Sequence, residues 1–493
     1  MTSARRGDRS PLLSAAVLAG LVLATGCDRG TGAGHGAGAA PGGAVVEPAV
    51  ATAPPRPANL LLVTVDTLRA DHLGFDGYPR DTSPRLDALA REGTWFRRCY
   101  TQSSTTGASH ATLFTSLPPQ AHGVHANKQR FPATLPSLIG ELRGHGYATA
   151  GFASSVVVGR KFGLQDVFEH FDDEFTTMEL NRVGRGERLA AETVAAVEAW
   201  IATVPRDRPF FAWMHLIDPH GPYAAPEDPD RFVGDSFDAR LGTRFPIGTD
   251  DFEAGHIPRY QALDGRTDAD FYVARYDGEI RYADGQLGRL LDFLRERGMD
   301  RDTLVVVTSD HGETLAEPGR RLVFSHGTVA YEETSRVPLV VREPRDAHRL
   351  AAAQDLPIGL IDVAPTVLGL LGFEPPAGFR GRDVLRRPHA PDDPMFTWGA
   401  YGTKRLEEVT GTQFSVRRGD LRFIRNSVDG RPELYDHRDD PAEAHDVATS
   451  RPAEVARLGD LVSAQFETSA APAPMKTMTP DHVEALKALG YVE

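Results

Sequence analysis

Three nearly unbroken apolar runs dominate the hydrophobic pattern of the chain. They cover residues 60–65, 209–214 and 303–308, and none of them alternates between apolar and polar positions. A continuous apolar run is typical of a parallel strand that is buried on both faces of its sheet. We therefore expect these three segments to form strands of a largely parallel sheet.

Helical patterns lie between these runs. Ser83 and Pro84 have the residue types of an N-cap and a first helical position, and Gly93 ends that pattern. Further amphipathic patterns cover about 135–142, 186–203 and 268–297. Strands that alternate with helices predict an α/β fold, an α/β/α sandwich with a large, mostly parallel sheet.

The pattern changes after residue 385. Residues 386–394 are rich in Pro, Arg and Asp and are typical of a link. Beyond them, short strand-like segments precede and follow the turn signal Asp429–Gly430, and they predict a small antiparallel sheet. We expect a larger domain over residues 58–385 and a small sheet-plus-helix subdomain over 386–493.

The N-terminal segment has the features of a targeting signal. Arg5, Arg6 and Arg9 precede an apolar run over residues 12–24, which is too short to span a bilayer. Small residues directly before Cys27 resemble a bacterial lipobox. We expect residues 1–27 to be a lipoprotein signal peptide and Cys27 to carry a lipid, which makes the protein exported and membrane-anchored. A plain signal peptide is the alternative.

Residues 28–57 are mostly Gly, Ala, Pro and Thr, which predicts a disordered tether. The composition of the 493-residue chain, with 41% hydrophobic and 25% charged residues, excludes a mostly disordered or polytopic membrane protein. A net charge of −14 argues against nucleic-acid binding. Two cysteines exclude a disulfide scaffold and a multi-cysteine zinc site.

Polar residues follow each of the three apolar runs. Asp66 ends the first, Asp310 and His311 follow the third, and the second leads into His215, Asp218 and His220. Parallel strands present their carboxyl ends at one edge of a sheet, where ligands bind. Two Asp oxygens and an imidazole suit one divalent cation. The alternative for any one of these residues is a turn or cap.

A segment of small hydroxyl residues, 103–106, leads through Gly107 into a helix-like stretch. A hydroxyl at a helix N-terminus faces free N–H groups, which favours an anionic substrate. Such a hydroxyl bound to a metal would be a nucleophile. An ordinary loop with capping hydroxyls is the alternative.

The combination resembles the sulfatase family of the alkaline-phosphatase superfamily. Residues 66–74 and 308–313 are similar to the two metal motifs of the family, and residues 106–110 lie where it carries Cys/Ser-x-Pro-Ser-Arg or Thr-x-Pro-Ser-His. Further similarities occur in consistent order at 215–223, 337–340, 361–366, 433–436 and 488–492.

The resemblance implies a role for each matched residue. Asp66, Asp310 and His311 would bind one divalent cation (Mn²⁺, Zn²⁺ or Ca²⁺), with the Thr106 oxygen completing the inner shell. Thr106 would attack phosphorus or sulfur to give a covalent ester. Asn127 would contact the substrate anion, as would His326, and His220 would lie near the leaving-group oxygen for proton donation or charge stabilisation.

Departures from the family pattern bear on the substrate. Sulfatases convert Cys or Ser into formylglycine, and threonine cannot give that aldehyde, so we expect none here. Ala108 replaces the motif proline, and Thr67 stands where many sulfatases have a second Asp. Unmodified Thr nucleophiles occur in superfamily branches that cleave or transfer phosphoesters, including nucleotide pyrophosphatase/phosphodiesterases and phosphoglycerol or phosphoethanolamine transferases.

Three hypotheses follow. The first is a metal-dependent hydrolase or transferase of a phosphodiester, phosphonate or phosphoglycerol-type ester. The second is a conventional sulfuric ester hydrolase, and the third is an inactive lipoprotein that binds an anion. One metal ion is preferred, although Asp218, His220 and His326 could hold a second.

Overall fold

The computed structural model describes residues 58–127, 129–182, 186–235, 242–249, 253–399, 412–427 and 430–466. The predicted signal peptide (1–27), with Cys27, and the tether (28–57) lie outside these residues. All described residues belong to one compact unit. Within that part of the chain, every helix is too short or too polar to cross a membrane.

A seven-stranded mixed sheet forms the centre of this unit, in the order β2-β10-β9-β1-β8-β4-β5. The three apolar runs are its adjacent strands β9 (Thr303–Ser309), β1 (Asn59–Val65) and β8 (Phe210–Leu216), which pair in parallel and are buried throughout. The other strands are β4 (Ala148–Phe152), β5 (His170–Asp172), β10 (Leu339–Arg342) and β2 (Thr94–Trp95). β10 is antiparallel to β9, whereas β4 and β5 extend the parallel part.

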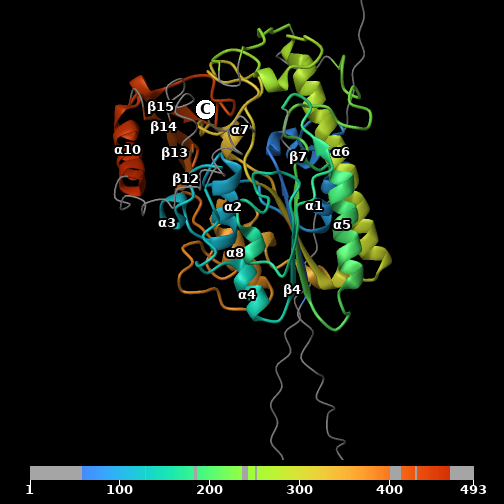
Figure 1. The fold of residues 1–493 in the computed structure, drawn as a ribbon. Coiled ribbons are helices and arrows are strands. Elements are labelled where there is room, and N and C mark those ends of the chain that lie inside the picture. The colour runs from blue at the N-terminus through green and yellow to red at the C-terminus, as the bar shows by residue number, and fades with distance from the viewer. Residues whose placement is uncertain are drawn as a thin grey trace, which may run out of the picture. The chain divides into compact units, whose positions relative to one another are not determined.

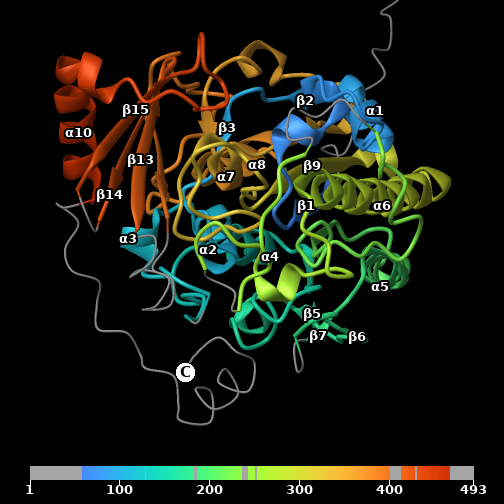
Figure 2. The same cartoon turned by 90° about the horizontal axis from the view of Figure 1, so that it is seen from above.

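Helices cover both faces of this sheet (Figures 1 and 2). One face packs against α1 (Pro84–Glu92), α5 (Ala190–Thr203) and α6 (Ala269–Glu296). The other packs against α2 (Thr106–Thr115), α4 (Leu138–Gly144) and α8 (Val363–Leu370). Each face buries its own apolar cluster, because every strand directs alternate side chains to opposite faces. The predicted fold class is confirmed.

The start of α1 follows the prediction in position but not in chemistry. Ser83 is the N-cap residue and Pro84 the first helical residue. The backbone N–H groups of Arg85 and Leu86, however, donate to the carboxylate of Asp284 on α6. The Ser83 hydroxyl instead donates to Asp87. A carboxylate from a packed helix meets the free N–H groups of the first turn, so the cap is a tertiary contact.

A second, four-stranded antiparallel sheet follows the large one along the chain. Its strands are β12 (Met395–Trp398), β13 (Gln413–Arg418), β14 (Leu421–Asn426) and β15 (Pro432–Asp436), and α10 (Pro452–Phe466) packs on it. Minor elements are α3 (Pro119–His122), α7 (Glu332–Ser335) and the pairs β3 (Cys99–Tyr100) with β11 (Ile358–Gly359) and β6 (Thr177–Met178) with β7 (Gly186–Glu187). The predicted boundary at residue 385 stays a prediction.

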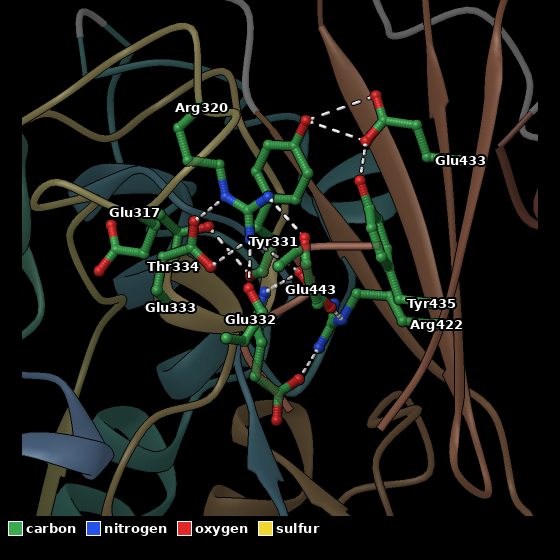
Figure 3. A network of polar contacts seen from close by, with 12 residues as sticks. Glu317, Arg320, Tyr331, Glu332, Glu333, Thr334, Arg422, Glu433, Tyr435 and Glu443 are labelled. Carbon is green, nitrogen blue, oxygen red and sulfur yellow. Dashed lines mark hydrogen bonds and ion pairs between the residues drawn. The ribbon is translucent and has the colours of Figure 1, made fainter. Parts of the chain in front are cut away.

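Buried charges join the small sheet to α7 (Figure 3). Arg422 on β14 is almost completely buried, lies 2.8 Å from Glu443 and also pairs with Glu332 on α7. Arg320 pairs with Glu333 at 2.6 Å and with Glu443 at 3.4 Å. Because these charges are out of water, the removal of one partner leaves another uncompensated.

We predict that Arg422→Met destabilises the protein by about 3 kcal/mol, because Glu332 and Glu443 then keep buried negative charge without their main partner. Calorimetric melting would measure the loss as a lower Tm. Arg418→Met is the matched control, because Arg418 is a half-buried residue at the end of β13. The Tm of this variant should be close to that of wild type. A wild-type Tm for Arg422→Met would contradict the prediction.

Candidate active site

The ends of β1 and β9 bring three predicted metal ligands together. Val65 and Ser309 are register partners, so Asp66 and the Asp310–His311 pair leave the sheet side by side. His311 Nε2 lies 3.8 Å from Asp66 Oδ1 and 3.3 Å from Asp310 Oδ2. All three side chains are buried. The sequence prediction of their proximity agrees with this geometry.

This cluster fits a divalent cation. One ligand atom from each of Asp66, Asp310 and His311 lies within 4.8 Å of the others. Asp66 Oδ1 and Asp310 Oδ2 are buried and accept no hydrogen bond from any residue that the structure describes. Burial raises the pKa of Asp66 to about 7. Unsatisfied buried carboxylate oxygens beside an imidazole are a donor set that a cation would satisfy.

The turn after β1 orients Asp310. Asp310 Oδ1 accepts the backbone N–H groups of Thr67 at 3.3 Å and His311 at 2.9 Å, which leaves Oδ2 facing the cluster. Thr67 has a φ of 56°, an uncommon conformation for a β-branched residue. The Tyr276 hydroxyl donates to its carbonyl at 2.8 Å and holds this turn in place.

Thr106 is the first residue of α2, as the hydroxyl-rich segment predicted. Its Oγ1 lies 3.2 Å from His311 Nε2, so the hydroxyl adjoins the acidic cluster at the positive end of a helix. His110 fixes this first turn, because Nδ1 donates to the Thr106 carbonyl at 2.8 Å and Nε2 accepts from Thr64 at 2.9 Å. The hydroxyl is thus held by rigid, buried structure.

Asn127 lies beside this hydroxyl. Its Oδ1 accepts the backbone N–H of Gly107 at 2.9 Å, the residue directly after Thr106. A Cβ at Gly107 would approach Asn127 Oδ1 to 3.3 Å, so the small residue permits this close approach. The predicted anion-contacting residue is therefore near the first turn of α2.

His220 and His326 come together next to the cluster. Their rings are 5.2 Å apart, and the ring of His326 lies 4.5 Å from that of His311. His220 Nδ1 donates to the Gly221 carbonyl at 2.8 Å, whereas His326 Nδ1 contacts Glu313 Oε1 at 3.0 Å. Both predicted histidines therefore adjoin the candidate metal-ligand group.

Of the two other polar residues predicted after β8, His215 lies beside the cluster and Asp218 does not. His215 Nε2 lies 3.4 Å from Asp66 Oδ2, so it adjoins the cluster. Asp218 instead accepts the N–H of Ala190 at the start of α5, at 3.0 Å, and burial raises its pKa to about 6. Asp218 therefore serves as a cap for the free N–H groups in the first turn of α5.

A second group, Glu332, His437 and Glu443, also has its ligand atoms within 4.8 Å. Arg422 pairs with both carboxylates. Guanidinium groups already compensate this negative charge, so the group has the character of an ion-pair network.

The sequence prediction assigned no role to Glu313 or His110. Glu313 is buried within reach of His326, and burial raises its pKa to about 8. It belongs to the same polar segment as Asp310 and His311, which was the available signal. His110 stands one turn after Thr106, a spacing that places both on one face of a helix.

The fold and the site together describe an α/β protein with a hydroxyl nucleophile candidate beside a candidate metal-ligand cluster. The sulfatase family model matches residues 58–373, and the model described as N-sulphoglucosamine sulphohydrolase, C-terminal, matches 324–465. The chain belongs to the sulfatase family, within the alkaline-phosphatase superfamily, and is an ester hydrolase.

Curated relatives span most of the chain. The uncharacterized sulfatase YidJ of Escherichia coli is 25% identical over 428 residues, which are 79% of this chain and 82% of YidJ. Human N-sulphoglucosamine sulphohydrolase is 27% identical over 399 residues, 75% of this chain and 74% of that protein.

Solved structures share the fold. The phosphonate monoester hydrolase of Agrobacterium radiobacter has a TM-score of 0.65 at 20% identity, over 84% of this chain and 96% of that one. A protein solved with D-glucosamine-2-N,6-O-disulfate has a TM-score of 0.66 at 19% identity, over 85% and 99%.

We predict that Zn²⁺ or Mn²⁺ raises the Tm more at pH 8 than at pH 6. In the metal-free fold, the pKa of Asp66 is about 7, above its ordinary 3.8, so the folded state binds more protons than the unfolded state between these values. Stability of the metal-free protein therefore falls as pH rises through that window. A cation held by this cluster would stabilise the ionised carboxylate and so offset this loss.

Melting curves with and without metal at the two pH values measure this difference. The Asp310→Asn variant should bind the cation too weakly for the metal to raise its Tm at either pH. That result would show that the Tm increase of the wild type depends on this cluster. Equal shifts for wild type at pH 6 and pH 8 would contradict the prediction.

Proposed function

We propose that this protein hydrolyses a phosphodiester, phosphonate or phosphoglycerol-type ester through a covalent ester on Thr106. The observation that carries the proposal is the Thr106 hydroxyl at the start of α2, 3.2 Å from His311 and beside unsatisfied carboxylate oxygens. A divalent cation held by Asp66, Asp310 and His311 would lower the pKa of the hydroxyl and stabilise negative charge.

Each remaining site residue has a task in this reaction. The Thr106 oxygen forms a bond to phosphorus, and the bond from phosphorus to the leaving oxygen breaks. Asn127 and His326 contact the anion, and the N-terminus of α2 favours its negative charge. His220 donates a proton to the leaving oxygen. Solvent takes the Thr106 proton in this step and returns it in the next.

The side chain of Thr106 favours phosphorus over sulfur. Threonine carries a secondary hydroxyl, and oxidation would give a ketone rather than formylglycine. Release of the esterified group from Thr106 therefore requires water to attack the central atom of the ester. Unmodified threonine nucleophiles occur in branches of the superfamily that cleave or transfer phosphoesters. The shared fold of phosphonate monoester hydrolases is compatible with this substrate class.

A sulfate ester is the second candidate. Human N-sulphoglucosamine sulphohydrolase aligns with three quarters of the chain, and a structural neighbour was solved with a disulfated glucosamine. Both names point to sulfated sugars. In this case Thr106 would form a sulfate ester without conversion to formylglycine.

We predict that Thr106→Ala lowers the turnover of the true substrate by several orders of magnitude, because the covalent route is lost. The full chain, loaded with Mn²⁺ or Zn²⁺, would be assayed with bis-p-nitrophenyl phosphate and p-nitrophenyl sulfate. We expect faster, Thr106-dependent cleavage of the phosphate diester.

Thr115→Ala, at the other end of α2, is a matched control because its buried hydroxyl donates to the Ala111 carbonyl within the helix. It should retain turnover. Preferred sulfate cleavage would favour the second candidate. Turnover that survives Thr106→Ala would reject the nucleophile, and no turnover of either ester would favour an anion-binding protein.

We further propose that the protein is exported and anchored to a membrane through a lipid on Cys27. The motif before Cys27 supports this proposal. We predict that the wild-type protein incorporates radiolabelled palmitate in a bacterial host and fractionates with membranes, and that Cys27→Ser does neither. Labelling of the Cys27→Ser protein would contradict this.

A further inference from the structure

Hydrolysis of an ester on Thr106 requires an attack by water that release from a formylglycine ester does not require. A hydrated aldehyde can expel its anion by breaking the carbon–oxygen bond, with no attack of water on the anion. Thr106 has no second hydroxyl on the same carbon, so water must attack the phosphorus or sulfur atom. Neutral water is a weak nucleophile, and a positioned base accelerates such a step by roughly 10²–10⁴-fold.

Glu313 and His326 form a pair suited to that task. His326 Nδ1 lies 3.0 Å from Glu313 Oε1. The other carboxylate oxygen, Oε2, accepts the Tyr223 hydroxyl at 3.2 Å. Glu313 and Tyr223 are fully buried. The carboxylate is therefore held from both sides, and it fixes the orientation of the imidazole.

This contact determines which nitrogen of His326 is available to take a proton. When Glu313 is ionised, its carboxylate accepts the Nδ1 hydrogen, and Nε2 is then the nitrogen that exchanges a proton during the reaction. The ring lies 4.5 Å from the ring of His311 and 5.2 Å from that of His220. Its side chain thus adjoins both the metal-ligand group and the other site histidine.

His220 is less suited to be the base. Its Nδ1 donates to the carbonyl of Gly221, a neutral acceptor, at 2.8 Å. A carboxylate stabilises the imidazolium that forms when the ring takes a proton, and a carbonyl does so less. Of the two Nδ1 contacts, that of His326 is with the stronger acceptor.

We propose that Glu313 is a positioning residue for His326 and that this pair activates the water that hydrolyses the covalent ester on Thr106. The proposal rests on the proposed function, since it requires that ester to form. It assigns Glu313 a role that follows from its contact with His326, and it divides the proton transfers between the two histidines.

The step balances as follows in atoms and protons. Water gives one proton to His326 Nε2, and its oxygen forms the new bond to phosphorus. The bond between phosphorus and Thr106 Oγ1 breaks, and Thr106 takes a proton from solvent. His326 then releases its proton, and His220, which protonated the leaving oxygen in the first step, regains one by exchange with solvent.

The experiment compares Glu313→Gln and His326→Asn with wild type in rapid-quench assays on the metal-loaded full chain. The probe is whichever of the two p-nitrophenyl esters the wild type cleaves faster. Nitrophenol release reports the first step, and mass spectrometry of the Thr106 peptide reports the ester. Glu343→Gln is the matched control: this buried carboxylate also pairs with a cation, Arg349, but follows the antiparallel strand β10 near the opposite edge of the sheet.

We expect Glu313→Gln to release one equivalent of nitrophenol rapidly and then to turn over about 10²-fold more slowly than wild type. His326→Asn also loses a contact with the anion, so it should slow the burst somewhat and the steady state much more. The Thr106 peptide should carry the esterified group in both variants and not in Glu343→Gln. A structural defect would lower the burst and the steady state together.

The role of Glu313 would be overturned if Glu313→Gln lost the burst and the steady-state rate equally and carried no esterified group on Thr106. It would also be overturned if Glu313→Gln kept the steady-state turnover of wild type. His326→Asn keeps the test open if the buried amide of Glu313→Gln unfolds that variant, which a Tm measurement would reveal. Turnover of wild type that does not depend on Thr106 would instead defeat the proposed function, and with it this inference.

Discussion

Parallel pairing of β1 with β9 is the constraint on which the site depends. This register places Asp66 next to Asp310 and His311, where the two strands leave the sheet. Carboxylate oxygens in that position are buried and lack hydrogen bonds from the described residues. Burial of such groups is costly unless a cation or a proton compensates them, and the raised pKa of Asp66 expresses that cost. The sheet thus builds a site that calls for positive charge.

The candidate nucleophile, Thr106, is positioned by rigid structure beside the cluster. Trp213 on β8 donates to Thr64 on β1 at 3.0 Å, and Thr64 donates to His110, which holds the carbonyl of Thr106. This chain of contacts ties the first turn of α2 to the two central strands. Because β1 also leads into the candidate metal ligand Asp66, the distance between the hydroxyl and the cluster is set by the core of the protein.

Threonine at this position changes the second half of the reaction more than the first. In both cases the attacking group is a hydroxyl that must lose its proton. Release differs, because only the aldehyde hydrate can expel its anion without water attacking it. The proposed activation of water by the buried Glu313–His326 pair would let a chain without formylglycine complete such a cycle.

The sequence predicted those parts of the fold whose pattern is local. Continuous apolar runs indicated β1, β8 and β9, and helical periodicity indicated α6. A strand buried on both faces needs apolar residues throughout, and a helix buried on one face needs them at helical spacing, so both patterns are visible in the sequence. β10 is a short strand antiparallel to its neighbour, and nothing in its four residues shows its direction. The Asp284 cap of α1 and the Asp218 cap of α5 depend on which segments pack together. Tertiary contacts of this kind, like that between Glu313 and His326, become visible only when the segments are brought together.

The central claim is that Asp66, Asp310, His311 and Thr106 converge on one divalent cation. Anomalous X-ray diffraction from crystals of the protein grown with Zn²⁺ tests it most directly. The account predicts one strong peak within bonding distance of both carboxylates, His311 Nε2 and Thr106 Oγ1. A peak bound elsewhere, with Thr106 turned away from these residues, would contradict it.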